Sequence, residues 1–250
     1  MPTSRPLEGI RVLEIASIIF GPLACQYLGD MGAEVIKLEP PEGDRTRVMG
    51  PKRNPRMGSF FLTSNRNKRS VVVDLKTPEG REILHALVAR TDVLLHSMRT
   101  SAATRLGLHY DTLAKDHPAL IYCHVTGYGE DGLYAGRAAY DDIIQAASGL
   151  AHLQTVIAGQ PRFIPTIVAD KISGLHAAYA IAMALLHRTR TGLGQKVDVA
   201  MFETMAAFNM VEHQWGTAFE PPIAPMGYEP VSTASRRPYK TLDGYMVLLP

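Results

Sequence analysis

The first half of the chain alternates between short apolar runs rich in β-branched residues and longer segments with apolar residues at helical spacing. The first pattern is typical of buried strands, and the second of amphipathic helices. The predicted strands are 10–16, 33–39, 69–75, 92–97 and 119–129, and the predicted helices are 22–32, 77–90 and a shorter one near 110–117. This alternation predicts an α/β fold, with a Rossmann-like parallel sheet covered by helices on both faces.

A different pattern begins at Asp170, where a single carboxylate precedes an almost uncharged run from Ile172 to Leu186. Aspartate is a preferred N-cap residue, and Gly192 fits the position after the last turn of a helix. The run is shorter than the ~20 apolar residues that a membrane span needs. We therefore expect a helix buried in the core, with Asp170 as its N-cap.

The composition changes at 219–230, where proline and glycine become frequent and predict a linker. Beyond it, Asp243-Gly244 between short apolar runs predicts a hairpin, and the chain stops inside an apolar strand. We expect a large α/β domain over 1–218 and the incomplete start of a smaller α+β domain over 219–250. The sequence is expected to be a fragment of a longer polypeptide.

Composition and charge narrow the functional classes. The chain is 46% hydrophobic and 20% charged, and its net charge of +2 is scattered, so no nucleic-acid partner is expected. Cys25 and Cys123 lie in apolar stretches and are predicted to be reduced core residues. The first residues lack the apolar segment of a secretion signal, so we expect a cytoplasmic protein without a membrane partner.

Several common catalytic motifs are missing from the sequence. The turn after the first predicted strand has one glycine where a dinucleotide fingerprint has three, and no ATP-binding phosphate loop occurs. The nine histidines never fall in a metal-ligand spacing, so no metal is expected. Carboxylate chemistry remains, and Asp170 is the best-placed carboxylate. It is either only a cap, or also a nucleophile that the helix dipole keeps ionised.

Several segments, in collinear order from residue 6 to about 215, carry a family resemblance. They are PLEGIRVLEIAS, GPLACQYLGDMGAEVIKLE, NRNKRSVVVDLKTPEGREIL, DVLLHSMRTSAATRLGL, YCHVTGYGEDG, YDDIIQAASGL and ADKISGLHAAYAIAMALLHRTRTGLGQKVDVAM. Together they resemble the family III CoA-transferases, which include formyl-CoA transferase, carnitine CoA-transferase and α-methylacyl-CoA racemase.

The resemblance implies transfer of CoA from an acyl-CoA to a carboxylic acid acceptor, with coenzyme A as carrier. The family's catalytic aspartate matches Asp170, which would form an acyl-aspartyl anhydride and then an aspartyl-CoA thioester. No ATP is needed, because the thioester energy is conserved. The resemblance also implies an interlocked homodimer and a glycine-rich loop over the aspartate that would lie beyond residue 250.

The same resemblance implies CoA-binding positions, residue by residue. They are Ile19 and Phe20 near the thioester, Val73, Asp74, Leu75 and Lys76 at a strand end, Ser97, Met98 and Arg99 after the next strand, Arg105 for phosphate, and Arg137 and Tyr140 along the cofactor. The chain departs from the family at 96–101, where only Arg99 is kept from a common Glu-Asn-Phe-Arg-Pro-Gly segment. Pro40 also stands where an arginine is frequent.

Two other functions stay open. The racemase branch needs a histidine opposite the aspartate, and the match places Tyr140 there, a poor base near neutral pH because its reference pKa is about 10. A CoA-binding protein without catalysis is the third possibility. The apolar Ile18-Ile19-Phe20 loop disfavours very small polar acyl groups and suggests a medium-sized carboxylic acid or dicarboxylate.

Overall fold

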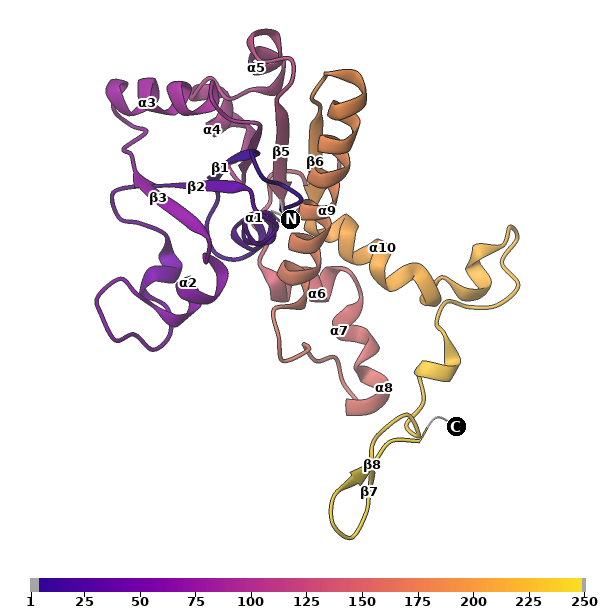
Figure 1. Cartoon of the computed structure of the whole chain (residues 1–250). Helices are drawn as coiled ribbons and strands as arrows, with labels where there is room; N and C mark the ends of the chain where they lie inside the picture. Colours follow the sequence, from indigo (N-terminus) through magenta and orange to yellow (C-terminus); the bar gives the residue numbers. More distant parts are fainter. Residues whose placement is uncertain (1–4, 249–250) are drawn as a thin grey trace. The chain divides into compact units, whose positions relative to one another are not determined.

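The computed structural model describes residues 5–248 of the protein. Its central element is a six-stranded parallel sheet in the order β3-β2-β1-β4-β5-β6 (Figure 1). The strands are β1 (Arg11–Ile15), β2 (Glu34–Glu39), β3 (Lys68–Val72), β4 (Val93–His96), β5 (Ile121–Thr126) and β6 (Lys196–Ala200). This order is that of a doubly wound, Rossmann-like sheet, so the predicted fold class is confirmed.

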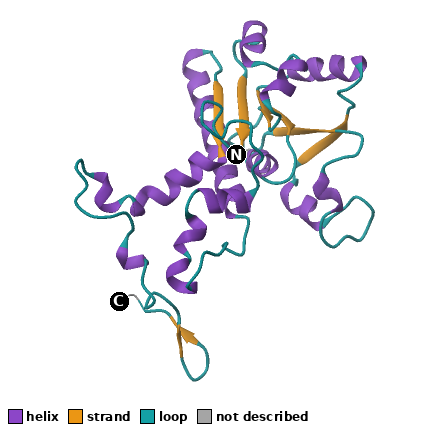
Figure 2. Ribbon diagram, turned by 180° about the vertical axis from the view of Figure 1, so that it is seen from behind, coloured by secondary structure: helices purple, strands orange, loops and turns teal. Residues whose placement is uncertain are grey.

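Helices connect the successive strands, as the alternating pattern predicts (Figure 2). Between β1 and β5 they are α1 (Phe20–Asp30), the 3-10 turn η1 (Arg45–Val48), α2 (Ser59–Ser64), α3 (Pro78–Val88), α4 (Thr100–Arg105) and α5 (Tyr110–Asp116). After β5 follow α6 (Asp141–Ala147), α7 (Leu150–Leu153), α8 (Thr155–Ala158), α9 (Val168–Thr191), α10 (Met201–His213), η2 (Trp215–Ala218), η3 (Glu229–Val231), β7 (Tyr239–Lys240) and β8 (Tyr245–Met246).

The chain divides into two compact units. Unit 1 comprises Met1–Ala138 and Asp170–Met201, and it contains the parallel sheet and nearly all of α9. Unit 2 comprises Ala139–Ala169 and Phe202–Pro250, and it contains α6, α7, α8 and most of α10. The boundary at 218/219 drawn from the sequence stays a prediction.

The two faces of the sheet in unit 1 differ in chemistry. Successive side chains of a strand point to opposite faces. Leu13 and Ile15 of β1 therefore join an apolar cluster with α3, α4 and α5, whereas Glu14 points to the other face. That face is covered by α1, which packs on β1, β2 and β4. Charged side chains are therefore buried under α1, while the face toward α3 carries the apolar cluster together with two buried histidines, His96 and His124.

Helix α9 packs into the core on one face only, so the prediction of a buried core helix is correct for that face and wrong for the other. Ala177, Ile181 and Ala184 recur at helical spacing on the buried face and are 0% exposed. The opposite face leaves four large apolar side chains exposed, namely Leu175, Tyr179, Met183 and Leu186. Apolar residues occupy the whole circumference, but no described element covers this second face. None of the helices in residues 5–248 is long and apolar enough to cross a membrane.

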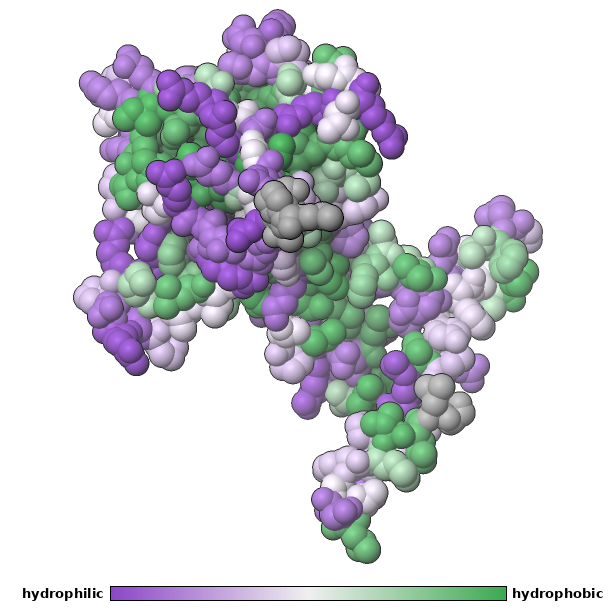
Figure 3. Space-filling model, viewed as in Figure 1, coloured by the Kyte–Doolittle hydropathy of each residue, from purple (hydrophilic) through white to green (hydrophobic). Residues whose placement is uncertain are grey.

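The predicted hairpin near the end of the chain is present. Strands β7 and β8 pair antiparallel around Asp243-Gly244, and the Thr241 amide donates to the Gly244 carbonyl at 2.9 Å. Leu242 in the turn of this hairpin is fully exposed, and Figure 3 shows hydrophobic and hydrophilic surface side by side at this end. Each strand has only two residues, so the hairpin offers few stabilising contacts of its own.

Candidate active site around Asp170

Asp170 lies in the first turn of α9 and is 9% exposed. The helix begins at Val168, two residues earlier, so the prediction that Asp170 is its N-cap is wrong. Its Oδ1 instead accepts a hydrogen bond from the backbone N–H of Phe20, 150 residues away, at 3.1 Å. Phe20 is the first residue of α1, and the N-cap position of that helix is Ile19, which offers no side-chain acceptor. Asp170 therefore supplies the cap that α1 lacks.

The position of this contact follows from the strand order. The order reverses between β1 and β4, and α/β proteins bind ligands in the crevice outside the carboxyl ends of the strands at such a point. The segment that contains Ile19 and Phe20 leaves the carboxyl end of β1, and Ser97–Arg99 leave the carboxyl end of β4. Asp170 is thus fixed at the edge where this fold presents its ligands.

Two glycines allow α1 to approach its neighbours closely. A Cβ added to Gly21 would lie 2.5 Å from the Ala16 Cβ, so only glycine fits beside the end of β1. A Cβ added to Gly174 would lie 3.2 Å from the Phe20 carbonyl oxygen, which brings α9 against α1. Gly174 is one helical turn after Asp170 and on the same side of α9. This close packing sets the Asp170 carboxylate at the start of α1.

Beneath this contact lies a group of buried charges that we call the Glu14 network, consisting of Glu14, Lys37, Asp44 and Lys68. Their side chains are at most 2% exposed. The Lys37 ammonium lies 2.7 Å from Glu14 and 2.9 Å from Asp44, and the Lys68 ammonium lies 2.7 Å from the second Glu14 oxygen. Burial pulls the pKa of Lys37 down, but Glu14 and Asp44 outweigh it and the pKa is raised. Burial dominates at Lys68, whose pKa is lowered although Glu14 opposes the shift.

The structure brings most predicted CoA-binding segments to one edge of the sheet. Val73 to Lys76 follow the carboxyl end of β3, and Ser97 to Arg99 follow that of β4, beside the Ile19-Phe20 segment after β1. The turn at Asp74 is fixed by local hydrogen bonds: its Oδ1 accepts from the Lys76 N–H at 3.0 Å, and Thr77 caps α3. Whether these residues contact CoA stays a prediction.

The four cations among the predicted CoA-binding residues share one feature. Lys76, Arg99, Arg105 and Arg137 are all exposed, and within residues 5–248 none of them forms a salt bridge of 4 Å or less to a carboxylate. Arg137 stacks on the ring of Tyr134, with 4.6 Å from the guanidinium carbon to the ring centroid. Tyr140, 59% exposed, belongs to unit 2, where it precedes α6. These cations are therefore accessible to an anionic ligand.

A second charged group, the His124 cluster, consists of His124, Glu130, Lys196 and Asp198. Ligand atoms of His124, Glu130 and Asp198 lie within 4.8 Å of one another, a geometry that suits a metal ion and that sequence spacing does not reveal. The ammonium of Lys196 lies 2.9 Å from Asp198 and 3.5 Å from Glu130, and it balances these carboxylates. Burial lowers the pKa of Lys196, but Asp198 and Glu130 outweigh it and raise the pKa. The expectation that no metal is bound stays untested.

His96 lies behind this cluster at the end of β4. Its ring stacks on that of His124 with centroids 4.5 Å apart, its Nδ1 accepts from the Met98 N–H at 3.3 Å, and its Nε2 lies 2.6 Å from the Tyr122 hydroxyl. Burial, with the charge of His124 as a smaller cause, lowers the pKa of His96 to about 3. A neutral imidazole with Nδ1 as acceptor carries its proton on Nε2, which then donates to Tyr122.

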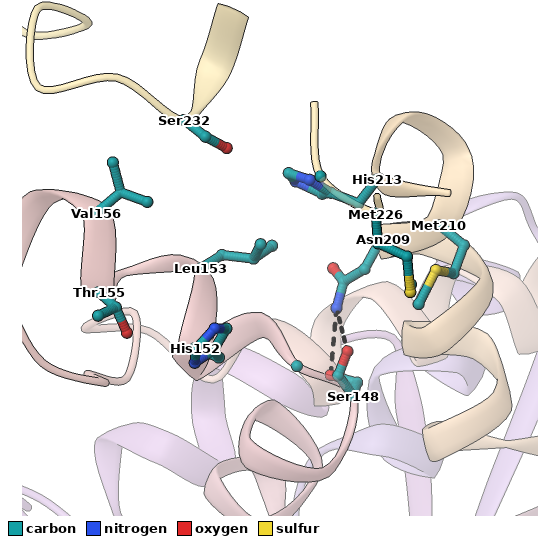
Figure 4. Close-up of a pocket in the computed structure, with 12 residues that line it drawn as sticks. Ser148, His152, Leu153, Thr155, Val156, Asn209, Met210, His213, Met226 and Ser232 are labelled. Carbon is teal, nitrogen blue, oxygen red and sulfur yellow. Dashed lines mark hydrogen bonds between the residues drawn. The ribbon is translucent and has the colours of Figure 1, made fainter. Parts of the chain in front are cut away.

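Unit 2 contains a mainly apolar cavity of about 540 Å³ (Figure 4). Leu153, Val156, Met210 and Met226 supply its apolar lining. Its polar side is held by Asn209, whose Nδ2 donates to the Ser148 carbonyl at 2.9 Å and approaches the Ser148 hydroxyl at 3.3 Å. A cavity of this volume and lining suits an apolar group of small-molecule size.

Both cysteines are buried and free, as the sequence predicts. Burial, followed by the charge of Glu14, raises the pKa of Cys25 well above its usual value, and burial likewise raises the pKa of Cys123. The reactive form of a thiol is the thiolate, so neither residue is suited to act as a nucleophile.

A doubly wound α/β protein with a buried carboxylate at its topological switch point is thus the class that fold and site define. Comparison with known proteins identifies the family within this class. The sequence pattern of CoA-transferase family III matches residues 7–250, and the chain belongs to this family.

Named relatives cover nearly the whole chain. It is 38% identical over 257 residues to a succinate–glutarate CoA-transferase of Agrobacterium fabrum, with 99% of this chain and 64% of that protein aligned. It is 38% identical over 256 residues to the succinyl-CoA:glutarate CoA-transferase of Mus musculus, with 98% of this chain and 56% of that protein aligned. A crystal structure of a CaiB/BaiF family protein from Brucella suis matches with a TM-score of 0.86 and 38% identity, covering 97% of this chain and 65% of that one. The chain therefore spans less than two thirds of the length of these relatives.

Proposed function

We propose that this protein transfers CoA from an acyl-CoA thioester to a free carboxylic acid, with Asp170 as the covalent nucleophile. The observation that carries the proposal is the Asp170 carboxylate, 9% exposed, held by the Phe20 N–H at 3.1 Å in a chain of CoA-transferase family III. Thioester energy is conserved through such an exchange, so no nucleotide hydrolysis is needed.

The first half of the reaction frees the donor acid. A carboxylate oxygen of Asp170 attacks the thioester carbonyl carbon, the carbon–sulfur bond breaks, and an acyl-aspartyl anhydride and CoA thiolate result. The thiolate then attacks the aspartyl carbonyl, which releases the donor carboxylate and leaves a thioester between Asp170 and CoA.

The second half mirrors the first with the acceptor acid. The acceptor carboxylate attacks the aspartyl thioester, which gives a new anhydride and CoA thiolate. Attack of the thiolate on the acceptor's carbonyl forms the product thioester and restores the Asp170 carboxylate. Every bond broken is matched by one formed, and no proton has to be moved.

The surroundings of Asp170 suit this cycle. Two helix starts meet there, because Asp170 lies in the first turn of α9 and contacts the first residue of α1. Helix N-termini carry partial positive charge, which keeps a carboxylate ionised and ready to attack. The same field favours the negative oxygen of a tetrahedral intermediate.

The CoA moiety is proposed to lie along the carboxyl edge of the sheet. Lys76 and Arg99 extend from the loops after β3 and β4, and both are exposed. Arg105 and Arg137 add two further exposed cations. A ligand that carries several phosphates needs charge-assisted donors of this kind. A cytoplasmic location and the homodimer implied by the resemblance belong to the same proposal.

The substrates are proposed to be medium-sized acids, with succinyl-CoA and glutarate as the pair to test first, because two relatives carry succinate or succinyl-CoA and glutarate in their names. Racemisation is not favoured, since it needs a proton-transfer group on each side of the substrate α-carbon. Tyr140 stands where the resemblance would place the second one.

One incubation separates transfer from racemisation. Succinyl-CoA and, in a parallel sample, a 2-methylacyl-CoA are each mixed with the protein in D₂O, with and without glutarate, and the products are followed by mass spectrometry. The proposal expects a new thioester that depends on glutarate, with no deuterium at the α-carbon. Deuterium uptake without an acceptor shows a racemase and contradicts the proposal, as does CoA binding with no product in either arm.

A further inference from the structure

The segment that presents the Phe20 N–H to Asp170 is held at both ends by buried ammonium groups. The segment runs from Ala16 to Pro22, across the end of β1 and the start of α1. The Lys37 ammonium donates to the Ala16 carbonyl at 2.8 Å, and the Lys68 ammonium donates to the Pro22 carbonyl at 2.6 Å. Phe20 lies between these two anchors.

The two lysines are fixed by their other neighbours. Lys37 also contacts Glu14 and Asp44, and Lys68 also contacts Asn65 at 2.8 Å and the second oxygen of Glu14. Each ammonium thus has three oxygen neighbours between 2.6 and 2.9 Å, two of them as hydrogen-bond acceptors and the third as an ion-pair partner. Glu14 joins the two lysines through its two oxygens. The anchors are therefore coupled through one buried carboxylate.

The segment between the anchors is strained. Ile18 has a φ of +70°, a left-handed conformation that is costly for a β-branched residue. Such a conformation persists only where the surroundings over-determine it, and it occurs preferentially at functional sites. Two ammonium anchors on either side of Ile18 supply that constraint. Without them the backbone can relax, and the Phe20 N–H then turns away from Asp170.

We propose that Lys37 and Lys68, joined by Glu14, are positioning residues that hold the Ala16–Pro22 segment in the conformation that aims the Phe20 N–H at Asp170. None of these residues reaches the reacting atoms in the proposal; they act through the backbone of the segment. The inference concerns the site of the proposed transfer reaction and rests on it. It explains why cations are buried under α1, where an apolar core would pack without them.

The test removes one anchor without leaving an unbalanced buried charge. The double variant Lys37→Met/Asp44→Asn deletes one cation and one anion. Its new asparagine keeps a side-chain oxygen for the Thr46 N–H, which donates to Asp44 Oδ1 at 2.9 Å in the wild type. Asp44→Asn alone retains the Lys37 bond to Ala16 and isolates the contribution of that anchor. Leu84→Ala, at a fully buried position on α3, is the control for a general loss of stability.

Two measurements are made on each variant below its unfolding temperature. NMR hydrogen exchange follows the Phe20 amide against amides of β4, and steady-state kinetics follow transfer from succinyl-CoA to glutarate. In the double variant we expect Phe20 exchange to rise on the order of tenfold or more relative to β4. We expect kcat to fall on the order of 10- to 100-fold with KM changed less than about threefold, because a displaced group acts on the reaction step.

If Lys37 positions the segment, the rise in Phe20 exchange and the fall in kcat are both larger in the double variant than in Leu84→Ala or Asp44→Asn. Equal changes in Leu84→Ala overturn the proposal, because Lys37 then acts only through overall stability. Faster Phe20 exchange with an unchanged kcat also overturns it. A wild-type protein without transfer activity contradicts the proposed function instead, and the exchange measurement still decides whether Lys37 holds the segment.

Discussion

The parallel sheet of unit 1 carries two groups of charged side chains that differ in their exposure to solvent. The Glu14 network under α1 has side chains at most 2% exposed, whereas in the His124 cluster Glu130, Lys196 and Asp198 are 34–51% exposed. Solvent screens the second group and leaves the first almost unscreened. Charge in the Glu14 network is therefore expected to dictate backbone position, while charge in the exposed part of the His124 cluster is expected to matter little for stability.

The largest expected effect comes from Glu14→Gln. This change keeps the shape of the side chain but leaves two buried ammonium groups with only Asp44 as a carboxylate partner. Breaking a buried charge group in this way costs about 3–5 kcal/mol of unfolding free energy. Urea denaturation followed by circular dichroism measures the loss.

The matched change in the other group is Glu130→Gln. Its side chain is 34% exposed and pairs with Lys196 at 3.5 Å, so its removal is expected to cost no more than about 1 kcal/mol. Comparable losses of unfolding free energy in the two variants would show that burial does not separate the two groups as we infer.

A change in pH is expected to alter the unfolding free energy through His96, the buried histidine that stacks on His124. Burial holds the pKa of His96 at about 3, below the usual value of 6.5, so the unfolded chain takes up this proton first as pH falls. The stability that neutral His96 contributes is complete above pH 6.5 and is lost from there down to about pH 3. The slope contributed by this residue is at most about 1.4 kcal/mol per pH unit.

His96→Gln should therefore flatten the dependence of unfolding free energy on pH between 6.5 and 3. The control is His109→Gln, at a histidine whose side chain is 45% exposed. Chemical denaturation at a series of pH values gives both slopes. A wild-type slope in His96→Gln would show that this residue titrates with little difference between the folded and unfolded states.

The comparison also shows what the sequence could and could not predict. The alternation of apolar runs predicts β1, β2, β4 and β5 within a few residues at each end, because strands buried on both faces are locally apolar. The helix that carries Asp170 was likewise predicted from local pattern. Glu14 and Lys37 give a signal that was missed: charged residues inside apolar strands, in register with each other across β1 and β2.

Contacts between segments that lie far apart in the chain could not be predicted from the local pattern of apolar and polar residues. The bond between Phe20 and Asp170 joins positions 150 residues apart, so the N-cap preference of aspartate suggested the wrong helix. The His124 cluster likewise depends on the pairing of β5 with β6, which sets His124 beside Asp198. The exposed face of α9 could not be predicted for the same reason, because the apolar character of a residue does not reveal whether another element of the fold covers it.

The central claim is that Asp170 is the covalent nucleophile, and trapping tests it most directly. The protein is mixed with succinyl-CoA and glutarate in the presence of hydroxylamine, then digested and mapped by mass spectrometry, with Asp170→Asn as the matched variant. We predict a hydroxamate on Asp170 that requires succinyl-CoA, and loss of both label and transfer in Asp170→Asn. A label on another residue, or substantial transfer by Asp170→Asn, would contradict the account.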